Sequence, residues 1–286
     1  MTLPPMSAPD ASEKAQFDLD AYCRRIGYDG AREPTLDTLC AIHRLHPQAI
    51  PFENLDVVLQ RPVAIDAESL QRKLVAEGRG GYCFEQNMLL SLALKALGFT
   101  VTALTARVRF MVPEHVVMPL THMLLKVDVG GEAYAVDVGF GANTLTGPLR
   151  LVSGLEQETP HEPFRLIETD GRWLAEVKVR EVWTPLYRFS VEPQHRADLD
   201  LGNWFMSTHP KSRFYNDLVV TRVRPEGRLA LNNNQLTVHS LSGASERRVL
   251  ETESELRAAL TGLFGLTLPD DPGLPAVLNR IASGAV

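Results

Sequence analysis

The chain has 286 residues, of which 44% are apolar, and it carries a formal net charge of −6 at neutral pH. This acidic balance argues against a protein that binds nucleic acid through a broad basic face, because such faces need clustered Lys and Arg. No stretch reaches the ~18 consecutive apolar residues of a membrane span, and the length predicts one large domain or two small ones.

Residues 1–16 are expected to form a loose tail, and they lack the apolar segment of a secretory signal. The three cysteines, Cys23, Cys40 and Cys83, show no CxxC spacing, which argues against a disulfide framework and a structural zinc site. A reducing cytoplasm is therefore the expected location, because a cysteine remains a thiol there.

The first hundred residues predict mostly helix. Apolar residues recur at helical spacing from Leu19 to Ile26, and Gly27 follows as a stop signal. Asp66 is a good N-cap for a later helix. The further helices are predicted over residues 35–46, 67–75 and 83–97.

Four residues in these helices are assigned to packing or to the surface. Cys23 and Cys40 each lie in an amphipathic stretch and are interpreted as structural. His43 and His46 are three residues apart, but no acidic or sulfur partner is near them and Pro47 is expected to end the helix. Both histidines are therefore predicted to lie on the surface rather than to bind a metal.

The pattern then changes to a period-two alternation of Val, Leu and aromatic residues, which is typical of strands. Gly130 and Gly131 separate two of these strands and predict a hairpin. A final helix is predicted over residues 253–263, and residues 139–163 are predicted to form a long connection. Helices first, strands second and a mixed end predict an α+β protein rather than a doubly wound sheet. The predicted strands cover residues 101–110, 123–129, 132–138, 164–169, 173–179, 218–223, 228–231 and 235–240.

The most informative segment runs from Arg79 to Asn87 and reads Arg-Gly-Gly-Tyr-Cys-Phe-Glu-Gln-Asn. Its two glycines allow a tight turn or the close approach of a ligand, and Cys83 then opens an apolar helix. The positive end of the helix dipole favours a nucleophilic thiolate at Cys83. Spacing alone leaves open the alternative of a buried cysteine that packs as a small hydrophobe.

A thiolate nucleophile needs a base, and the base needs an orienting partner. His122 lies at the mouth of one predicted strand and Asp137 at the far end of the next, so the hairpin brings them near each other in an approximate register. A carboxylate within Ala-Val-Asp-Val is expected to be buried and to need a partner, which His122 can supply. The alternative is a solvated Asp137 with an unrelated surface histidine.

Two further segments are weaker signals. The Gly-Phe-Gly motif at residues 139–141 offers backbone N–H groups that bind an anion or line a channel, or it forms a plain turn. Lys211 and Arg213 could meet the phosphates of a carrier, or they belong to a solvated basic turn.

These motifs in their order resemble the arylamine N-acetyltransferase family, and the resemblance covers nearly the whole chain after the tail. The Arg-Gly-Gly-aromatic-Cys block is the most specific of them. The motifs that carry the resemblance are Pro51-Phe52-Glu53-Asn54-Leu55, Arg79-Gly80-Gly81-Tyr82-Cys83-Phe84-Glu85, Thr121-His122-Met123, Val136-Asp137-Val138-Gly139-Phe140-Gly141, and Ser207-Thr208-His209-Pro210 with Ser212 and Phe214.

The resemblance implies an N-terminal helical bundle over residues 1–98, a β-barrel-like domain over residues 99–205 and an α/β lid over residues 206–286. It implies a papain-like cysteine triad between the first two domains. It also implies ping-pong transfer of an acetyl group from acetyl-coenzyme A, through an acetyl-cysteine, to the nitrogen of an arylamine or arylhydrazine. Acetyl-coenzyme A is then a cosubstrate, and neither a metal nor a tightly bound cofactor is expected.

Carried over position by position, the resemblance assigns the catalytic roles to Cys83, His122 and Asp137. The aromatic residues that match the acceptor and acyl pocket are Phe52, Phe140 and Phe214. The positions that match the coenzyme cleft are Thr121, Gly139, Gly141 and Thr208. Gln86 departs from the family pattern, which has an apolar residue there, and it shares roughly one helix face with Cys83.

The implied mechanism starts from a Cys83 thiolate and a His122 imidazolium that Asp137 orients. The backbone N–H of Cys83 is expected to help hold the oxyanion. Arg79 and Glu53 are predicted to form a buried pair behind the Cys83 loop.

Three other functions compete with this interpretation. An amide synthase would release or cyclise a carrier-bound polyketide with the same triad and would ignore simple anilines. A cysteine hydrolase or transglutaminase-like enzyme would produce acetate or ammonia. A binding module that kept the fold would form no acyl-enzyme. The physiological amine, the length of the acyl chain and a homo-oligomeric state stay open.

Overall fold

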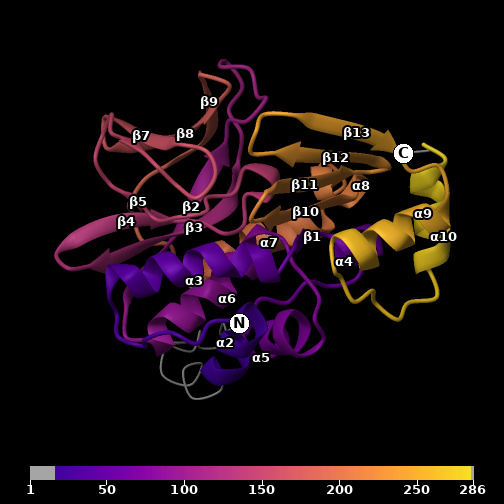
Figure 1. Cartoon of the computed structure of the whole chain (residues 1–286), viewed down its shortest axis with the longest axis horizontal. Coiled ribbons are helices and arrows are strands. Elements are labelled where there is room, and N and C mark those ends of the chain that lie inside the picture. Colours follow the sequence, from indigo (N-terminus) through magenta and orange to yellow (C-terminus); the bar gives the residue numbers. More distant parts are fainter. Residues whose placement is uncertain (1–16, 285–286) are drawn as a thin grey trace, which may run out of the picture.

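The computed structural model describes residues 17–284, and the predicted tail over residues 1–16 lies outside them. Figure 1 shows a layer of helices from the N-terminal third, a barrel-like sheet, and a second sheet flanked by the C-terminal helices. The predicted α+β class is therefore confirmed. Among the described residues, no helix combines the length and the apolar character that crossing a membrane requires.

The helical layer is centred on α6 (Cys83–Ala96), in which every residue from Cys83 to Leu94 is buried. A helix that is buried all round belongs in the middle of a core. The predicted helix over Leu19–Ile26 ends as expected, with Gly27 at a left-handed φ of +70°. The other helices of this layer are α2 (Leu19–Ile26), α3 (Leu36–Ala49), α4 (Leu55–Val58), α5 (Ala67–Leu70) and its π-helical continuation η1 (Gln71–Ala76).

Three predictions about α3 are wrong. The helix continues through Pro47 to Ala49, because a proline near a helix end removes one hydrogen bond and its φ suits a helix. His43 and His46 are fully buried rather than on the surface. Cys40 is exposed rather than structural, because it lies outside the face that α3 packs against the core.

The barrel-like sheet has eight strands in the order β5-β4-β3-β2-β9-β8-β7-β6. These are β2 (Thr100–Val108), β3 (Leu120–Val129), β4 (Glu132–Val136), β5 (Leu149–Arg150), β6 (Glu156–Gln157), β7 (Phe164–Thr169), β8 (Arg172–Val179) and β9 (Val182–Phe189). Gly130 and Gly131 have φ values of +61° and +82° and turn the predicted hairpin between β3 and β4. The sequence patterns miss β9, which pairs with β2 and joins the two halves of the sheet.

The second sheet has five strands in the order β1-β10-β11-β12-β13. Its first strand comes from the N-terminal third, and Phe52 there lies opposite Thr221 of the next strand. The strands are β1 (Phe52–Glu53), β10 (Val219–Arg224), β11 (Gly227–Asn232), β12 (Gln235–Ser240) and β13 (Ser245–Val249).

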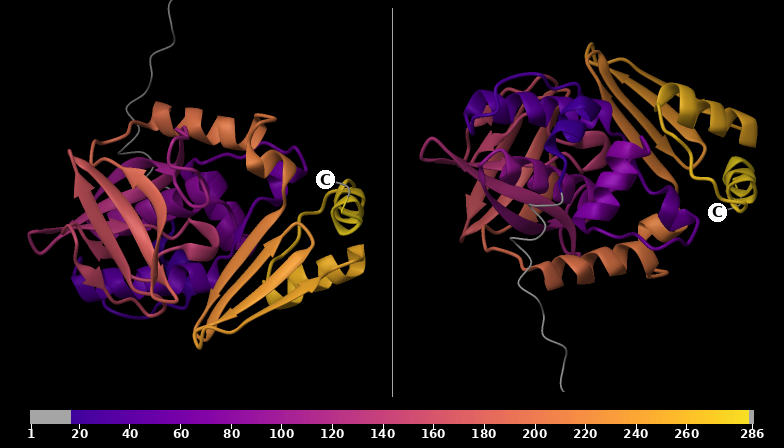
Figure 2. Two further views of the ribbon diagram at one scale, coloured as in Figure 1. Left: turned by 90° about the horizontal axis from the view of Figure 1, so that it is seen from above. Right: turned by 90° about the horizontal axis from the view of Figure 1, so that it is seen from below.

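The C-terminal helices lie on the face of this second sheet that is turned away from the rest of the molecule (Figure 2). The predicted helix over residues 253–263 is present, but it is not the final one, because α10 follows it. Two unpredicted helices, α7 and α8, connect the two sheets. The connecting helices are α7 (Arg196–Thr208) and α8 (Arg213–Asn216), and the helices on the outer face are α9 (Glu253–Ala258) with its π-helical continuation η3 (Ala259–Leu263), and α10 (Leu274–Ala282).

Candidate active site

Cys83 is the first residue of α6, as the sequence predicts, and its side chain is buried. Its sulfur lies 3.8 Å from the carbonyl oxygen of Thr121. The first N–H groups of a helix have no carbonyl partner within that helix, so they present positive partial charge beside this sulfur. The position therefore suits a reacting anion.

The two glycines before Cys83 make room for neighbouring backbone rather than for a ligand. A Cβ atom at Gly80 would lie 2.1 Å from the carbonyl oxygen of Pro51. The N–H of Gly81 donates to the same oxygen over 3.3 Å, and the N–H of Glu53 donates to the Gly81 carbonyl over 3.1 Å. The loop that precedes Cys83 is thus fixed against β1.

His122 lies in β3 and Asp137 directly follows β4. The register of this hairpin places Leu125 opposite Val136, so its continuation places Asp137 opposite Leu124, two residues from His122. Positions two apart along a strand share one face of a sheet, and their side chains meet diagonally. Nε2 of His122 lies 2.7 Å from Oδ2 of Asp137, and the hairpin needs no bulge to bring them together.

The electrostatics of this pair favour a charged imidazolium. Burial opposes the charge, but the Asp137 carboxylate outweighs burial and, with hydrogen bonding to Cys83, holds the pKa of His122 well above its ordinary value. Burial alone would raise the pKa of Asp137, yet His122 attracts its charge and lowers that pKa overall. Since Nε2 is occupied by the carboxylate, the remaining ring nitrogen is the one available to Cys83.

Asp137 is held by further groups to which the sequence interpretation gave another role or none. Nδ2 of Asn87 donates to Oδ1 of Asp137 over 2.9 Å, and the Gly139 N–H donates to the same oxygen over 2.8 Å. Nε2 of His43 lies 3.1 Å from the Asp137 carbonyl oxygen. Asn87 is four residues after Cys83, and this helical spacing is a signal that could have identified it.

Gly139 of the motif at residues 139–141 is required by close packing against α6. A Cβ atom at Gly139 would lie 2.8 Å from the Cα of Cys83, so only glycine fits there. The Gly139 N–H is used by Asp137, and the Phe140 N–H donates to Oγ1 of Thr144 over 3.3 Å. These two N–H groups are therefore not offered to an anion, and the motif leads into a 3-10 turn, η2 (Gly141–Asn143).

Aromatic side chains gather in two groups at the site. On one side, the ring of Phe214 lies 5.6 Å from that of Phe52 and 5.8 Å from that of Tyr82, measured between centroids. On the other side, the His122 ring lies 5.0 Å from Phe140 and 4.9 Å from Tyr187. These distances are typical of favourable aromatic pairs. Tyr187 belongs to the unpredicted strand β9, and no local pattern connects it to His122.

The residues matched to a coenzyme cleft differ in their surroundings. Thr121 is buried next to Cys83, whereas the hydroxyl of the exposed Thr208 donates to the Trp204 carbonyl over 2.6 Å. In the basic segment, Lys211 is exposed and the Arg213 guanidinium donates to Oδ1 of Asn232 over 2.8 Å. The Arg213 side chain is therefore already hydrogen-bonded within the protein.

Gln86 is fully buried, and both ends of its side-chain amide are bonded within the protein. Its Oε1 lies 2.7 Å from Nε2 of His46, and its Nε2 donates to the carbonyl oxygens of Pro51 and Gly81 over 2.8 and 3.1 Å. On the other side, Nδ1 of His46 lies 2.8 Å from the Tyr22 hydroxyl. Burial lowers the pKa of His46 to about 3, so this chain of hydrogen bonds contains a neutral imidazole.

Within residues 17–284, no group of three or more His, Cys, Asp or Glu side chains comes together as a metal would require. The predicted pair behind the Cys83 loop is confirmed, since Nη2 of Arg79 lies 2.9 Å from Oε1 of Glu53.

Residues 35–272 match the family model described as N-acetyltransferase. The arylamine N-acetyltransferase of Mycolicibacterium smegmatis is 45% identical to this chain, over 90% of this chain and 94% of that protein. The Escherichia coli K12 arylamine N-acetyltransferase is 40% identical, over 88% and 90% respectively.

Solved structures agree with these relatives. The structure of the M. smegmatis enzyme superposes with a TM-score of 0.89 at 42% identity, covering 93% of this chain and 99% of that one. The Mycobacterium marinum arylamine N-acetyltransferase in complex with CoA has a TM-score of 0.89 at 39% identity, covering 92% and 99%. The order and geometry of the site, the family model and these relatives lead to one conclusion: the chain belongs to the arylamine N-acetyltransferase family.

Proposed function

We propose that this enzyme transfers an acetyl group from acetyl-coenzyme A to the nitrogen of an arylamine or arylhydrazine through an acetyl-Cys83 intermediate. The observation that carries the proposal is the position of Cys83 at the start of α6, beside a His122 ring whose Nε2 is held 2.7 Å from Asp137. The CoA complex of the M. marinum neighbour supports coenzyme A as the carrier.

In the first half-reaction, the Cys83 thiolate attacks the thioester carbonyl and the bond between the acetyl carbon and the coenzyme sulfur breaks. His122, protonated at the start, gives its proton to the departing sulfur and becomes neutral. The Cys83 N–H at the helix start holds the developing oxyanion, and a donor of this kind contributes roughly 10²–10³-fold in rate.

In the second half-reaction, the amine nitrogen attacks the acetyl group and the bond to the Cys83 sulfur breaks. Neutral His122 takes the proton that the nitrogen loses, which restores the thiolate and the imidazolium together. Asp137 keeps the ring in the orientation and tautomer that both steps need.

The flat acceptor fits between the two aromatic groups, with Phe52 and Phe214 on one side and Phe140 on the other, because aromatic rings gain contact area there. We assign Thr121, Gly139, Gly141 and Thr208 to the coenzyme cleft by the family pattern. A free thiol as the nucleophile suits a reducing cytoplasm.

Intact-mass spectrometry after mixing with acetyl-coenzyme A, without an amine, tests the proposal. We expect the wild-type protein and Cys40→Ser to gain one acetyl group, which an added arylamine then removes, and Cys83→Ala to gain none. Cys40 is the matched control because its thiol is exposed. An unmodified wild-type protein that still reacts with carrier-bound thioesters would favour the amide synthase instead, and release of acetate without any amine would favour a hydrolase.

A further inference from the structure

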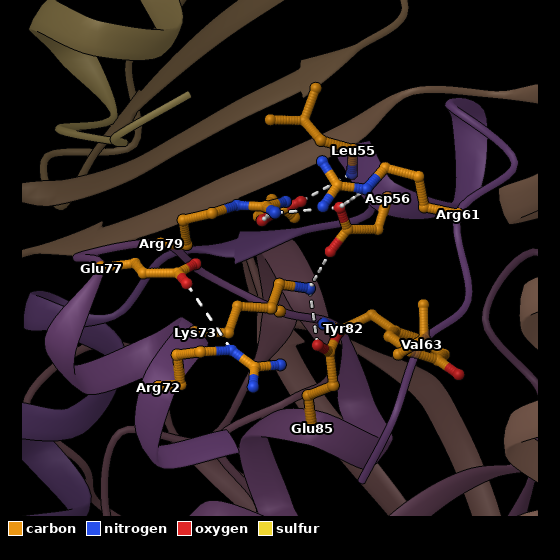
Figure 3. A network of polar contacts seen from close by, with 12 residues as sticks. Leu55, Asp56, Arg61, Val63, Arg72, Lys73, Glu77, Arg79, Tyr82 and Glu85 are labelled. Carbon is orange, nitrogen blue, oxygen red and sulfur yellow. Dashed lines mark hydrogen bonds and ion pairs between the residues drawn. The ribbon is translucent and has the colours of Figure 1, made fainter. Parts of the chain in front are cut away.

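Behind the first turn of α6 lies a group of five charged residues, which we call the ionic cluster: the buried Glu53, Asp56, Arg79 and Glu85 and the partly buried Lys73. Figure 3 shows Asp56, Lys73, Arg79 and Glu85 of this cluster. Lys73 is at its centre, with Nζ 2.7 Å from Oδ2 of Asp56 and 2.6 Å from Oε1 of Glu85. Arg79 forms two further ion pairs, with Nη1 2.9 Å from Asp56 and Nη2 2.9 Å from Glu53.

One carboxylate of the ionic cluster binds the backbone directly before Cys83. Oε2 of Glu85 accepts from the Tyr82 N–H over 3.1 Å, and Tyr82 directly precedes Cys83. The other oxygen of the same carboxylate is the one that Lys73 holds. Glu85 therefore links the Lys73 ammonium to the residue that caps the helix. A displacement of this carboxylate would change the direction of the adjacent N–H groups, including that of Cys83.

Burial makes each charge in the ionic cluster depend on its partners. The side chain of Lys73 is 13% exposed and that of Glu85 only 2%. Removing one member of a buried ion pair leaves an uncompensated charge. The cluster holds three carboxylates and two cations, so the loss of Lys73 would leave Glu85 without a cation and Asp56 with Arg79 and the more distant Arg61.

We propose that Lys73 is a positioning residue for acetyl transfer: by holding the Glu85 carboxylate against the Tyr82 N–H, it fixes the start of α6 and aims the Cys83 N–H at the oxyanion. The inference rests on the proposed acetyl-Cys83 mechanism. It assigns no chemical step to Lys73, whose side chain lies behind the helix rather than at the sulfur.

The surroundings make this support sensitive to pH. Burial raises the pKa of Glu85 to about 7, with Glu53 and Asp56 adding to the effect and Lys73 opposing it. Burial also works against the charge of Lys73, but the neighbouring carboxylates outweigh it and raise its pKa. The charged groups that face Glu85 are Lys73 from η1, Asp56 from α4, Glu53 from β1 and, through them, Arg79 from the loop before α6.

Protons can reach Glu85 from the side away from Cys83. A polar cavity of about 120 Å³ adjoins the ionic cluster, and the exposed side chains of Arg72 and Glu77 border it. At about 30 Å³ per molecule, such a cavity accommodates several waters. As the pH falls through about 7, Glu85 becomes protonated and a weaker acceptor for the Tyr82 N–H, so acetylation of Cys83 is expected to slow. His122 does not cause this decrease, because its pKa is raised and its charge is complete there.

The test measures two reactions of Cys83 in Lys73→Met, Lys73→Arg and the matched control Arg72→Met. Arg72 is the neighbouring residue of η1, and its ion pair with Glu77 is exposed. Single-turnover acetylation by acetyl-coenzyme A reports on oxyanion stabilisation, whereas alkylation by iodoacetamide forms no oxyanion. Peptide mass spectrometry follows Cys83, with the exposed Cys40 as an internal reference.

We expect Lys73→Met to slow acetylation by about 10- to 100-fold while alkylation of Cys83 changes by less than about threefold. Lys73→Arg keeps the charge and should stay within about threefold of wild type in both reactions, and Arg72→Met should leave both unchanged. If Lys73→Met acetylates within about twofold of wild type, or if both reactions slow equally, Lys73 does not position the oxyanion donor.

Glu85→Gln provides a second test in case Lys73→Met does not fold. The amide oxygen can still accept from the Tyr82 N–H but cannot titrate. We expect the decrease of the acetylation rate below about pH 7 to disappear in this variant, and a decrease that persists unchanged would overturn the inference. A wild-type protein that is alkylated at Cys83 but never acetylated would instead contradict the proposed function.

Discussion

Two groups of buried charges flank the first turn of α6, and they use different cations. Beside Cys83, the His122 ring lies 2.7 Å from the Asp137 carboxylate. Behind the same turn, Lys73 and Arg79 hold the carboxylates of the ionic cluster. Imidazole gains and loses a proton near neutral pH, whereas Arg stays charged and this Lys is held charged by its carboxylates. In the proposed mechanism, a proton moves to and from His122 on one side of the helix, while the cations on the other side keep their charge and hold the backbone in place.

The largest expected loss of activity comes from replacing the sulfur of Cys83. Cys83→Ser is expected to lower kcat/KM for an arylamine by roughly 10⁴-fold or more, because a hydroxyl is a far weaker nucleophile in this setting. Steady-state acetylation assays measure this loss. Cys40→Ser should keep wild-type rates, and a large loss in that control as well would contradict the assignment of Cys83.

The second prediction concerns Asp137, whose charged carboxylate can be replaced by a neutral amide of nearly the same shape. Asp137→Asn is expected to lower kcat by roughly 10³–10⁴-fold, because the ring loses the acceptor that selects its tautomer and stabilises its charge. The matched control is Asp128→Asn. Asp128 lies on the same hairpin, but it is paired with Lys126 and partly exposed, so this variant should change kcat little. Equal losses in the two variants would count against the proposed role of Asp137.

Removing a cation of the ionic cluster is expected to lower the free energy of unfolding. Arg79→Met leaves Glu53 and Asp56 buried without their guanidinium and is expected to lower the free energy of unfolding by about 3–5 kcal/mol. For a chain of this size, this corresponds to a Tm about 6–10 °C lower by calorimetry.

The control for this prediction is Arg32→Met, whose pair with Asp20 is more than half exposed on both sides. An exposed pair contributes at most about 1 kcal/mol, so its Tm should change little. An Arg79→Met protein as stable as wild type would show that the ionic cluster is not stabilising.

The smallest expected effect concerns a third buried cation, Arg228, which holds Glu162 with an N–O distance of 2.6 Å. Burial raises the pKa of Glu162, but Arg228 outweighs it and lowers that pKa overall. This contribution to stability is therefore present above the ordinary glutamate pKa and is lost as the pH falls through the lowered folded-state pKa.

Glu162→Gln is expected to lower the free energy of unfolding at neutral pH by about 1 kcal/mol and to flatten its decrease at acidic pH. Urea unfolding at a series of pH values measures both effects. Glu85, whose pKa is raised, has the opposite sign, because its contribution is lost as the pH rises. Identical pH slopes for wild type and Glu162→Gln would contradict the prediction.

Local patterns predicted the elements that carry the site. The helical spacing from Leu19 to Ile26 and the stop at Gly27 define α2 as observed, and the apolar run after Cys83 defines α6. The glycine pair at 130–131 predicts the hairpin that brings His122 to Asp137. These features follow from the sequence because helix and strand periods, glycine turns and hairpin pairing act over a few residues.

Only the tertiary structure decided which polar residues are buried and what they contact. Pro47 suggested a helix end and a surface for His46, yet that ring is buried between partners 24 and 40 residues away, Tyr22 and Gln86. Tyr187 reaches His122 from a strand that the patterns miss. Lys73 meets Asp56 and Glu85 only once three segments have packed together. A buried polar group is stabilised by whichever partner the fold supplies, and such partners leave no periodic signal along the chain.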